Sequence, residues 1–316
     1  MRYYDLKVIN PADGRVAFQA GSYPGGVYDP GALNVIFDLY TYQFATPKGA
    51  CSVTIEGVDP AILSNAQNFA VPGKGYLIEV RGGMMAGLPL ANPAQAGLLF
   101  QGKIYQSFGN WMGTEINLNL VFAASSVMST APNLVLNWTS GLPLSRALTN
   151  ALTTAYPNAK IKMNISTYAL PYDEKSFHGN MTQFAQHVSD ITGGAVQISS
   201  GGDTIWVSDP SYKPPPIQLQ FLDFVGQPTW IDQNTIQIIT VLRADITPGA
   251  TILMPTGIQN QPGFVQTTAA SSPSMINYQS AIKGKFTVLA VRQIGNLRQP
   301  DGTAWCTVIN ASPVPA

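Results

Sequence analysis

Charged residues are scarce in this sequence. Asp, Glu, Lys and Arg make up 11% of its 316 residues, against about 25% in ordinary soluble domains. The 17 basic residues balance the 17 acidic ones, so the chain lacks the basic surface that nucleic-acid binding requires. Hydrophobic residues reach 45%, enough for a core. Because interface cores are depleted in charge, we expect burial against other subunits. A β-rich surface of Ser, Thr, Asn and Gln is the alternative.

Cysteine and histidine, the usual metal ligands, are also rare. Cys51 and Cys306 are the only cysteines, so we expect buried free thiols in a reducing cytosol and no disulfide framework. His178 and His187 lie in no metal-binding motif, and His187 reads as a surface residue. No nucleotide-binding glycine motif and no GxSxG turn is present. We therefore expect no catalytic residue, no cofactor and no metal, and the chain is not expected to be an enzyme.

Long apolar runs are missing as well. No run reaches the roughly 18 residues that span a bilayer, so we expect no membrane insertion. No basic segment with a following apolar stretch opens the chain, and no secretory signal is expected.

A β pattern is present, and it occurs twice. The run Cys51–Glu56 precedes a Pro-Gly turn at Pro72, a strand to Val80, Gly102-Lys103 and a strand over Glu115–Phe122. Near the other end, the order returns in five segments: Thr235–Leu242, Pro248-Gly249, a strand to Met254, Gly284-Lys285 and Ala304–Ile309. Two related barrels in one chain would give a trimer six similar modules.

The segment between the two copies has a different pattern. Apolar residues at helical spacing predict a helix over Leu142–Ala155, and Pro157 ends it. Asn180 and Gln183 match a capping box for a second helix that Gly193-Gly194 ends. A strand over Lys160–Ile165 and a hairpin over residues 195–207 complete a small α/β unit. The chain is thus predicted to be mainly β, with tube-like β-barrel domains at 1–130 and 213–316 and an α/β domain at 131–212.

The order of these elements resembles that of baseplate hub proteins of contractile-tailed bacteriophages, the tail-tube-like hub family. The resemblance rests on Val53–Gly57, Pro72–Val80, Leu99–Ile104, the two helices and hairpin of the middle segment, and Gly226–Trp230. It covers nearly the whole chain, although hubs of the family are often longer.

The resemblance implies a structural role in the virion tail baseplate, after assembly in the host cytoplasm. In the family, a homotrimer joins a trimeric spike protein to the hexameric tail tube protein and initiates the tube. Tape-measure and baseplate wedge proteins are further candidate partners, and DNA would only pass through the channel. A tail-associated glycoside hydrolase and a β-sandwich carbohydrate-binding or adhesin module stay open as alternatives.

Edge-to-edge strand pairing around a ring would satisfy open strand edges. The expected ring strands are Leu33–Phe44 with Cys51–Glu56, and Thr235–Leu242 with Phe286–Arg292. The apolar loop Gly82–Leu90 is a further expected contact, against the alternative that it folds back onto its own barrel. The hypothesised interface residues are Tyr40, Tyr42, Thr54, Met84, Met85, Ile238 and Val288.

Overall fold

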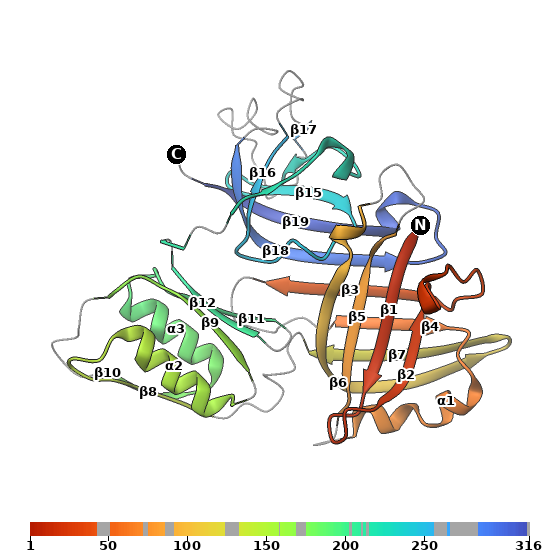
Figure 1. Ribbon diagram of the computed structural model, residues 1–316, viewed down its shortest axis with the longest axis horizontal. Coiled ribbons are helices and arrows are strands. Elements are labelled where there is room, and N and C mark those ends of the chain that lie inside the picture. The colour runs from red at the N-terminus through yellow and green to blue at the C-terminus, as the bar shows by residue number, and fades with distance from the viewer. Residues whose placement is uncertain are drawn as a thin grey trace. The chain divides into compact units, whose positions relative to one another are not determined.

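The computed structural model describes twelve stretches of the chain: residues 1–42, 51–71, 75–85, 92–123, 133–157, 159–168, 175–201, 204–209, 211–212, 215–255, 264–265 and 284–314. The chain divides into two units (Figure 1). The first comprises Met1–Thr41, Gly49–Ala124 and Pro215–Ala316, and the second comprises Tyr42–Lys48 and Ser125–Pro214. Both β regions, predicted as separate domains, therefore belong to the first unit. We call its residues up to 124 region one and its residues from 215 region two.

Region one is an antiparallel sheet in the order β3-β4-β7-β6-β5-β1-β2. Its strands are β1 (Arg2–Ile9), β2 (Val16–Gly21), β3 (Asn34–Tyr42), β4 (Cys51–Glu56), β5 (Leu77–Met84), β6 (Gly97–Met112) and β7 (Glu115–Ala123). Between β4 and β5, the short helix α1 (Pro60–Ser64) begins at Asp59, which caps the Ala61 amide, and the 3-10 helix η2 (Ala66–Ala70) follows. The predicted strands Cys51–Glu56 and Glu115–Phe122 and the hairpin of β3 with β4 are confirmed.

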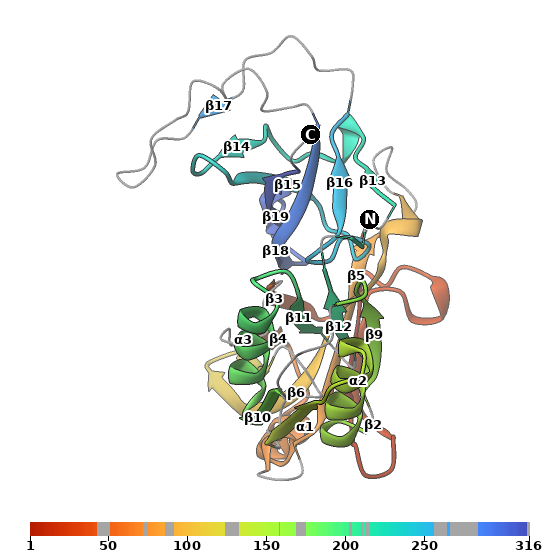
Figure 2. The ribbon, with the colours of Figure 1, turned by 90° about the vertical axis from the view of Figure 1, so that its left-hand side faces the viewer.

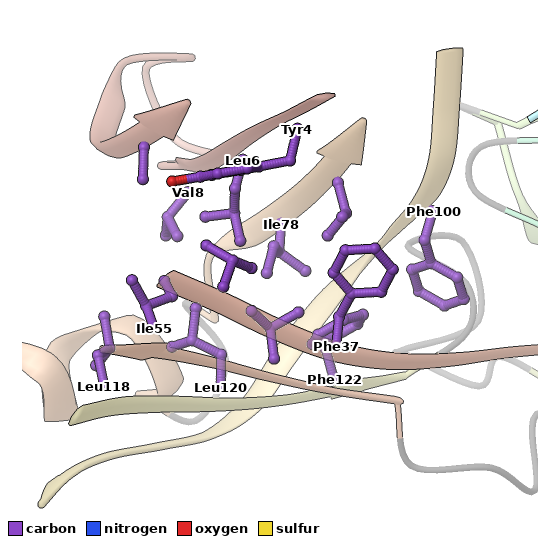
Figure 3. Packing of buried hydrophobic residues seen from close by; sticks show 14 of the residues in the cluster. Tyr4, Leu6, Val8, Phe37, Ile55, Ile78, Phe100, Leu118, Leu120 and Phe122 are labelled. Carbon is purple, nitrogen blue, oxygen red and sulfur yellow. The ribbon is translucent and has the colours of Figure 1, made fainter. Parts of the chain in front are cut away.

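Alternation of apolar and polar residues explains how this sheet builds a core. In β4 the side chains of Cys51, Val53 and Ile55 are buried and those between them are not. Period two places such residues on one face of a strand. Figure 3 shows side chains of β1 and β5, such as Leu6 and Ile78, directed toward Ile55 and Leu120 from the opposite layer. The sheet thus curls over its own apolar face.

Region two contains the long strands β18 and β19 and five shorter strands (Figure 2). They are β13 (Ile217–Gln218), β14 (Thr229–Trp230), β15 (Ile236–Val241), β16 (Thr251–Leu253), β17 (Phe264–Val265), β18 (Lys285–Asn296) and β19 (Trp305–Pro313). The pairing order is β17-β14-β15-β19-β18, and β16 also pairs with β18. The pairs β13–β16 and β14–β17 are parallel, and the others are antiparallel.

The same pairing order occurs in both regions. Strands β4, β7, β6 and β5 pair successively, as do β15, β19, β18 and β16. Each long strand also carries a register shift where it meets its hairpin partner, between Ile104 and Gln106 in β6 and between Val288 and Ala290 in β18. Just before the shift, the Ile104 amide donates to the Tyr76 carbonyl at 2.9 Å, and the Val288 amide to the Ala250 carbonyl at 2.9 Å. Ile104 and Val288 are therefore counterparts.

This correspondence differs slightly from the one that the sequence motifs suggest. Matching Gly102-Lys103 with Gly284-Lys285 aligns Ile104 with Phe286. In the structure the counterpart of Ile104 is Val288, two residues further along. Because side chains alternate with period two, a shift by two residues leaves every side chain on the same face. The sequence motifs therefore give the correct strand order, although the alignment they suggest is two residues out of register. Strand β6 continues to Met112, and the turn before Glu115 follows it.

Two further predictions need correction. The chain is mainly β, as predicted, but the pairings among its described residues do not close either region into a barrel. Strand β15 does not pair with β18 as expected, because β19 lies between them. The Pro-Gly turn at 72–74 lies outside the described residues.

The second unit is a small α/β fold. It contains β8 (Leu134–Trp138), α2 (Leu144–Ala155), β9 (Lys160–Asn164), β10 (Lys175–Gly179), α3 (Met181–Ile191), β11 (Gln197–Gly201) and β12 (Thr204–Ser208). Both predicted helices, the capping box of Asn180 with Gln183 and the hairpin β11–β12 are confirmed. Gly193 and Gly194 end α3 with φ of 63° and 84°, a conformation that glycine adopts without strain. The antiparallel pair β8–β10 was not predicted.

Candidate functional site: the junction between the two β regions

Strands β18 and β3 are hydrogen-bonded neighbours and join both regions into one sheet. Their arrows point in opposite directions in Figure 1. Just beyond β18, the Leu297 amide donates to the Val35 carbonyl at 3.2 Å. Region two therefore covers an edge of region one that would otherwise expose unpaired backbone groups.

An ion pair fixes the side chains across this strand pair. The Nε and Nη2 atoms of Arg292 donate to the two carboxylate oxygens of Asp38 at 2.8 and 2.6 Å. The guanidinium also lies 4.8 Å from the ring centroid of Tyr40. The hydrogen bonds from Arg292 to Asp38 raise the pKa of the guanidinium above its ordinary value. Such a two-pronged contact specifies register as well as contributing energy.

Two more arginines hold the segment that follows β18. The Arg298 side chain donates to the Ala32 carbonyl at 3.0 Å, and its amide donates to Asn34 Oδ1 at 3.1 Å. Arg2, at the start of β1, donates to the carbonyls of Asn296 at 2.7 Å and Asp301 at 2.6 Å. It also donates to the carbonyls of Leu297 and Gln299. Each of these two side chains belongs to one β region and binds the backbone of the other.

The apolar centre of the junction contains two aromatic rings. Phe37 of β3 and Trp305 of β19 pack edge to face with their centroids 5.2 Å apart. The Trp305 indole donates to the Gly83 carbonyl at 3.0 Å. Trp305 and Leu242, both from region two, lie in the buried cluster of region one. Region two therefore completes the core of region one.

A buried polar bridge also links the two regions. Arg243 is 2% exposed, and its Nε and Nη2 atoms donate to Asp245 at 2.6 Å each. Its Nη1 atom lies 3.1 Å from Asp223, which in turn accepts from Gln95 of region one at 3.0 Å. Burial favours a lower pKa for Arg243, but the hydrogen bonds and charges of Asp245 and Asp223 outweigh it and raise that pKa.

Three hypothesised interface residues lie on β3 and β4. Tyr40 lies under Arg292 at the junction. Thr54 donates to Asn119 of β7 at 2.8 Å. Tyr42 ends β3, and its side chain is outside the described residues. Whether any of the three contacts another chain stays a prediction.

The other four hypothesised residues fall into two pairs, one at the end of β5 and one in the core of region two. Met84 belongs to β5 rather than to a loop, and it packs against the core of region one. The amide of Met85 donates to the Met1 carbonyl at 2.9 Å, and residues 86–91 lie outside the described residues. Ile238 and Val288 have no exposed surface in this chain, because they lie in the core of region two. Their contact with another chain is likewise untested.

Sequence reasoning did not find the arginines that build the junction. Arg2, Arg243, Arg292 and Arg298 match no motif. Except for Asp245, which is two residues from Arg243, their side-chain partners lie far along the chain or are backbone carbonyls. The one available signal was the low content of charge, because a scarce charged residue that is retained often has a specific partner.

The described residues contain no group of three or more His, Cys, Asp or Glu side chains placed to hold a metal ion. The two histidines belong to the second unit, and His187 is half-buried and stacks on Phe177 at a centroid distance of 4.9 Å, rather than standing free on the surface. In the described stretches, every helix is too short or too polar to cross a membrane.

Comparison with known proteins gives matches by structure only. No family model matches the sequence, and no curated protein matches it. The fold is similar to that of a tail protein from Neisseria meningitidis MC58, with a TM-score of 0.51 and 13% identity over 99% of this chain and 96% of that one. It is also similar to the 43 kDa tail protein of prophage MuSo2 from Shewanella oneidensis, with a TM-score of 0.53 and 8% identity over 99% and 98% of the two chains. The chain shares its fold with these two proteins along its whole length.

Proposed function

We propose that this chain is a structural protein of a phage tail, where it forms the trimeric hub of the baseplate. The observation that carries the proposal is the recurrence of one strand order in two regions of a single sheet. Two similar regions per chain give a trimer six similar positions around its axis. A trimer of this kind can contact a threefold partner on one face and a sixfold partner on the other.

Two findings support the proposal. The fold is similar, over nearly the whole chain, to that of a tail protein from Neisseria meningitidis MC58 and of the 43 kDa tail protein of prophage MuSo2. The 11% content of charged residues suits a chain that buries much of its surface in an assembly. In this proposal the chain catalyses no reaction. Its partners are two further copies, a spike protein and a tail tube protein, and it is located in the virion tail.

The mass of the purified chain and its position in an intact tail test the proposal. Mass photometry over a range of concentrations should reveal a trimer. Image averages of tails should place one ring of this protein, with threefold symmetry and six similar lobes, between spike and tube. A chain that is monomeric at every concentration and absent from tails would exclude the hub.

A further inference from the structure

Strand β2 is the last strand of the sheet in region one, and it pairs only with β1 (Figure 1). Directly after β2, the Ser22 amide donates to the Tyr4 carbonyl at 3.0 Å. Because bonded positions alternate along an antiparallel strand, the backbone groups of Gln19 and Gly21 point away from β1. Among the described residues, no backbone group forms a hydrogen bond with this edge, and β1 is the only helix or strand that packs along β2.

The edge of β2 lacks the residues that usually protect such an edge. No charged residue and no proline lies between Val16 and Tyr23. The register shift between β1 and β2 lies at the other end of the pair, beside Val16, and leaves Gln19 and Gly21 in regular pairing positions. An uncharged, regular strand edge can accept a strand from another polypeptide.

Three tyrosines adjoin this edge. Tyr23 packs against Tyr3 at a centroid distance of 6.0 Å and against Tyr28 at 5.5 Å. We call these three residues the tyrosine cluster. Tyr28 is 40% exposed, and the neighbouring Val27 is 71% exposed. Exposed tyrosines beside an apolar residue are typical of the centre of a protein interface.

The turn that carries Val27 and Tyr28 is held by backbone hydrogen bonds. The Val27 amide donates to the Pro24 carbonyl at 3.4 Å. The amide of Asp29 donates to the Ser22 carbonyl at 3.0 Å and closes the turn against the end of β2. A turn that is already ordered loses little conformational entropy when a partner binds.

This surface occurs once in the chain, whereas the strand order β4-β7-β6-β5 recurs in region two. There β13 pairs with β16, the counterpart of β5, and so takes the place of β1. Among the described strands, β13 has no second partner, and region two therefore shows no counterpart of β2. A trimer carries six copies of the recurring strand order but three copies of the β2 edge. Three equivalent sites match a threefold partner rather than a sixfold one.

We propose that the edge of β2 and the tyrosine cluster bind the threefold spike protein, with one site on each subunit of the hub. Each spike subunit contributes an extended, uncharged segment that pairs with Gln19 and Gly21 as an added strand. Val27 and Tyr28 contact the apolar side chains of that segment. The inference rests on the proposed function, because it assigns the surface at which the hub meets the spike.

Site-specific photocrosslinking in intact tails tests this assignment. The photoreactive residue p-benzoylphenylalanine replaces Tyr28 in the full-length chain, and purified tails are irradiated and analysed by mass spectrometry. We expect Tyr28 to crosslink to a protein present in three copies per tail, on the spike side of the ring. The control position is Val135, which is 51% exposed on β8 of the second unit. It should not crosslink to that protein.

A charged double variant provides a second test. Val27→Asp combined with Tyr28→Asp places two carboxylates in an apolar contact, and we expect the spike content of purified tails to fall by about tenfold or more. Both positions are exposed, so the variant should keep the trimer mass and the urea midpoint of wild type. Val135→Asp is the matched control and should leave the spike content unchanged.

The outcomes separate this inference from the proposed function. The chain can form threefold rings in tails while Tyr28 crosslinks to a sixfold protein, to another copy of the chain or to nothing. In that case the spike contact is wrong and the hub proposal stands. Normal spike content in the double variant overturns the contact in the same way. If the chain is absent from tails, the hub proposal fails and the spike contact fails with it.

Discussion

At the scale of single residues, Arg243 shows what a buried charge contributes to the stability of the first unit. Replacing it with Met leaves the Asp223 carboxylate, whose side chain is only 11% exposed, without its cationic partner. Removing one partner of a buried pair costs about 3–5 kcal/mol, and we expect urea unfolding to show a loss of that size. Arg15, whose side chain is 86% exposed beside Asp13, provides the control, since Arg15→Met should unfold like wild type. Equal stability of both variants would contradict the structural role of Arg243.

In the second unit, Asp209 is a buried charged residue with several partners. Its carboxylate accepts hydrogen bonds from the Ser166 amide at 2.7 Å, the Tyr168 hydroxyl at 2.9 Å and the Ser211 amide at 2.9 Å, and also from both serine hydroxyls. Burial alone favours a higher pKa, but these hydrogen bonds outweigh it and lower the pKa of Asp209 well below its ordinary value. The carboxylate ties the segments after β9 and β12 together.

This lowered pKa predicts a pH dependence of stability. Because the folded pKa lies below the unfolded value of about 3.9, the stabilisation is complete above about pH 4 and is lost as pH falls through the folded pKa. Asp209→Asn should therefore lower the free energy of unfolding of the second unit by about 2 kcal/mol at pH 7, with a smaller deficit below about pH 4. The control is Asp190→Asn, at an exposed position of α3. A deficit that does not depend on pH would contradict the role of the charge.

At the scale of elements, the contact of β18 with β3 depends on a missing side chain. A Cβ atom at Gly295 would lie 2.2 Å from the ring of Phe37, which is 2% exposed. We expect Gly295→Ala to lower the free energy of unfolding of the first unit by about 1–3 kcal/mol, because the buried ring must move. At Gly21 the nearest atom to an added Cβ is the Tyr4 carbonyl oxygen at 3.5 Å, an ordinary contact. Gly21→Ala is therefore the control in urea unfolding, and equal stability of both variants would show that the junction can relax.

Elements whose signals are local could be predicted from the sequence. The bounds of β4 follow from alternation over six residues, and α3 follows from a capping residue, an apolar stripe and two glycines. The recurring order of strands was also predictable, because turn glycines and apolar runs mark each strand even when the register is wrong by two residues.

The junction itself could not be predicted. Asp38 and Arg292 are 254 residues apart, and nothing near either one identifies its partner. Strand β10 pairs with β8 across a helix and a strand, so the segment Lys175–Gly179 had no local hairpin signal. Ile238 and Val288 lie on strands in which buried positions alternate with less buried ones. An alternating pattern in the sequence does not tell whether the apolar face meets the chain's own core or another subunit.

At the scale of the whole molecule, the two β regions depend on each other in a way that the second unit does not. Trp305 and Leu242 of region two complete the core of region one. The buried cluster of the second unit contains only residues between Leu134 and Val207. The boundaries of cooperative folding should therefore follow the two units rather than the three segments of the sequence.

Expressing the parts separately tests this expectation. Residues 125–214 alone should fold cooperatively, because their core is internal. Their length also exceeds the roughly 40 residues below which a domain usually needs disulfides, metals or oligomerisation to be stable. Buried Trp138, whose indole donates to the Leu142 carbonyl at 2.8 Å, reports folding by fluorescence. Residues 1–124 alone should be unstable or aggregate, since they lose Trp305 from their core and leave the edge of β3 open. Cooperative, soluble folding of residues 1–124 would show that the junction joins two independent domains, and an unfolded fragment 125–214 would show that the second unit needs the rest of the chain.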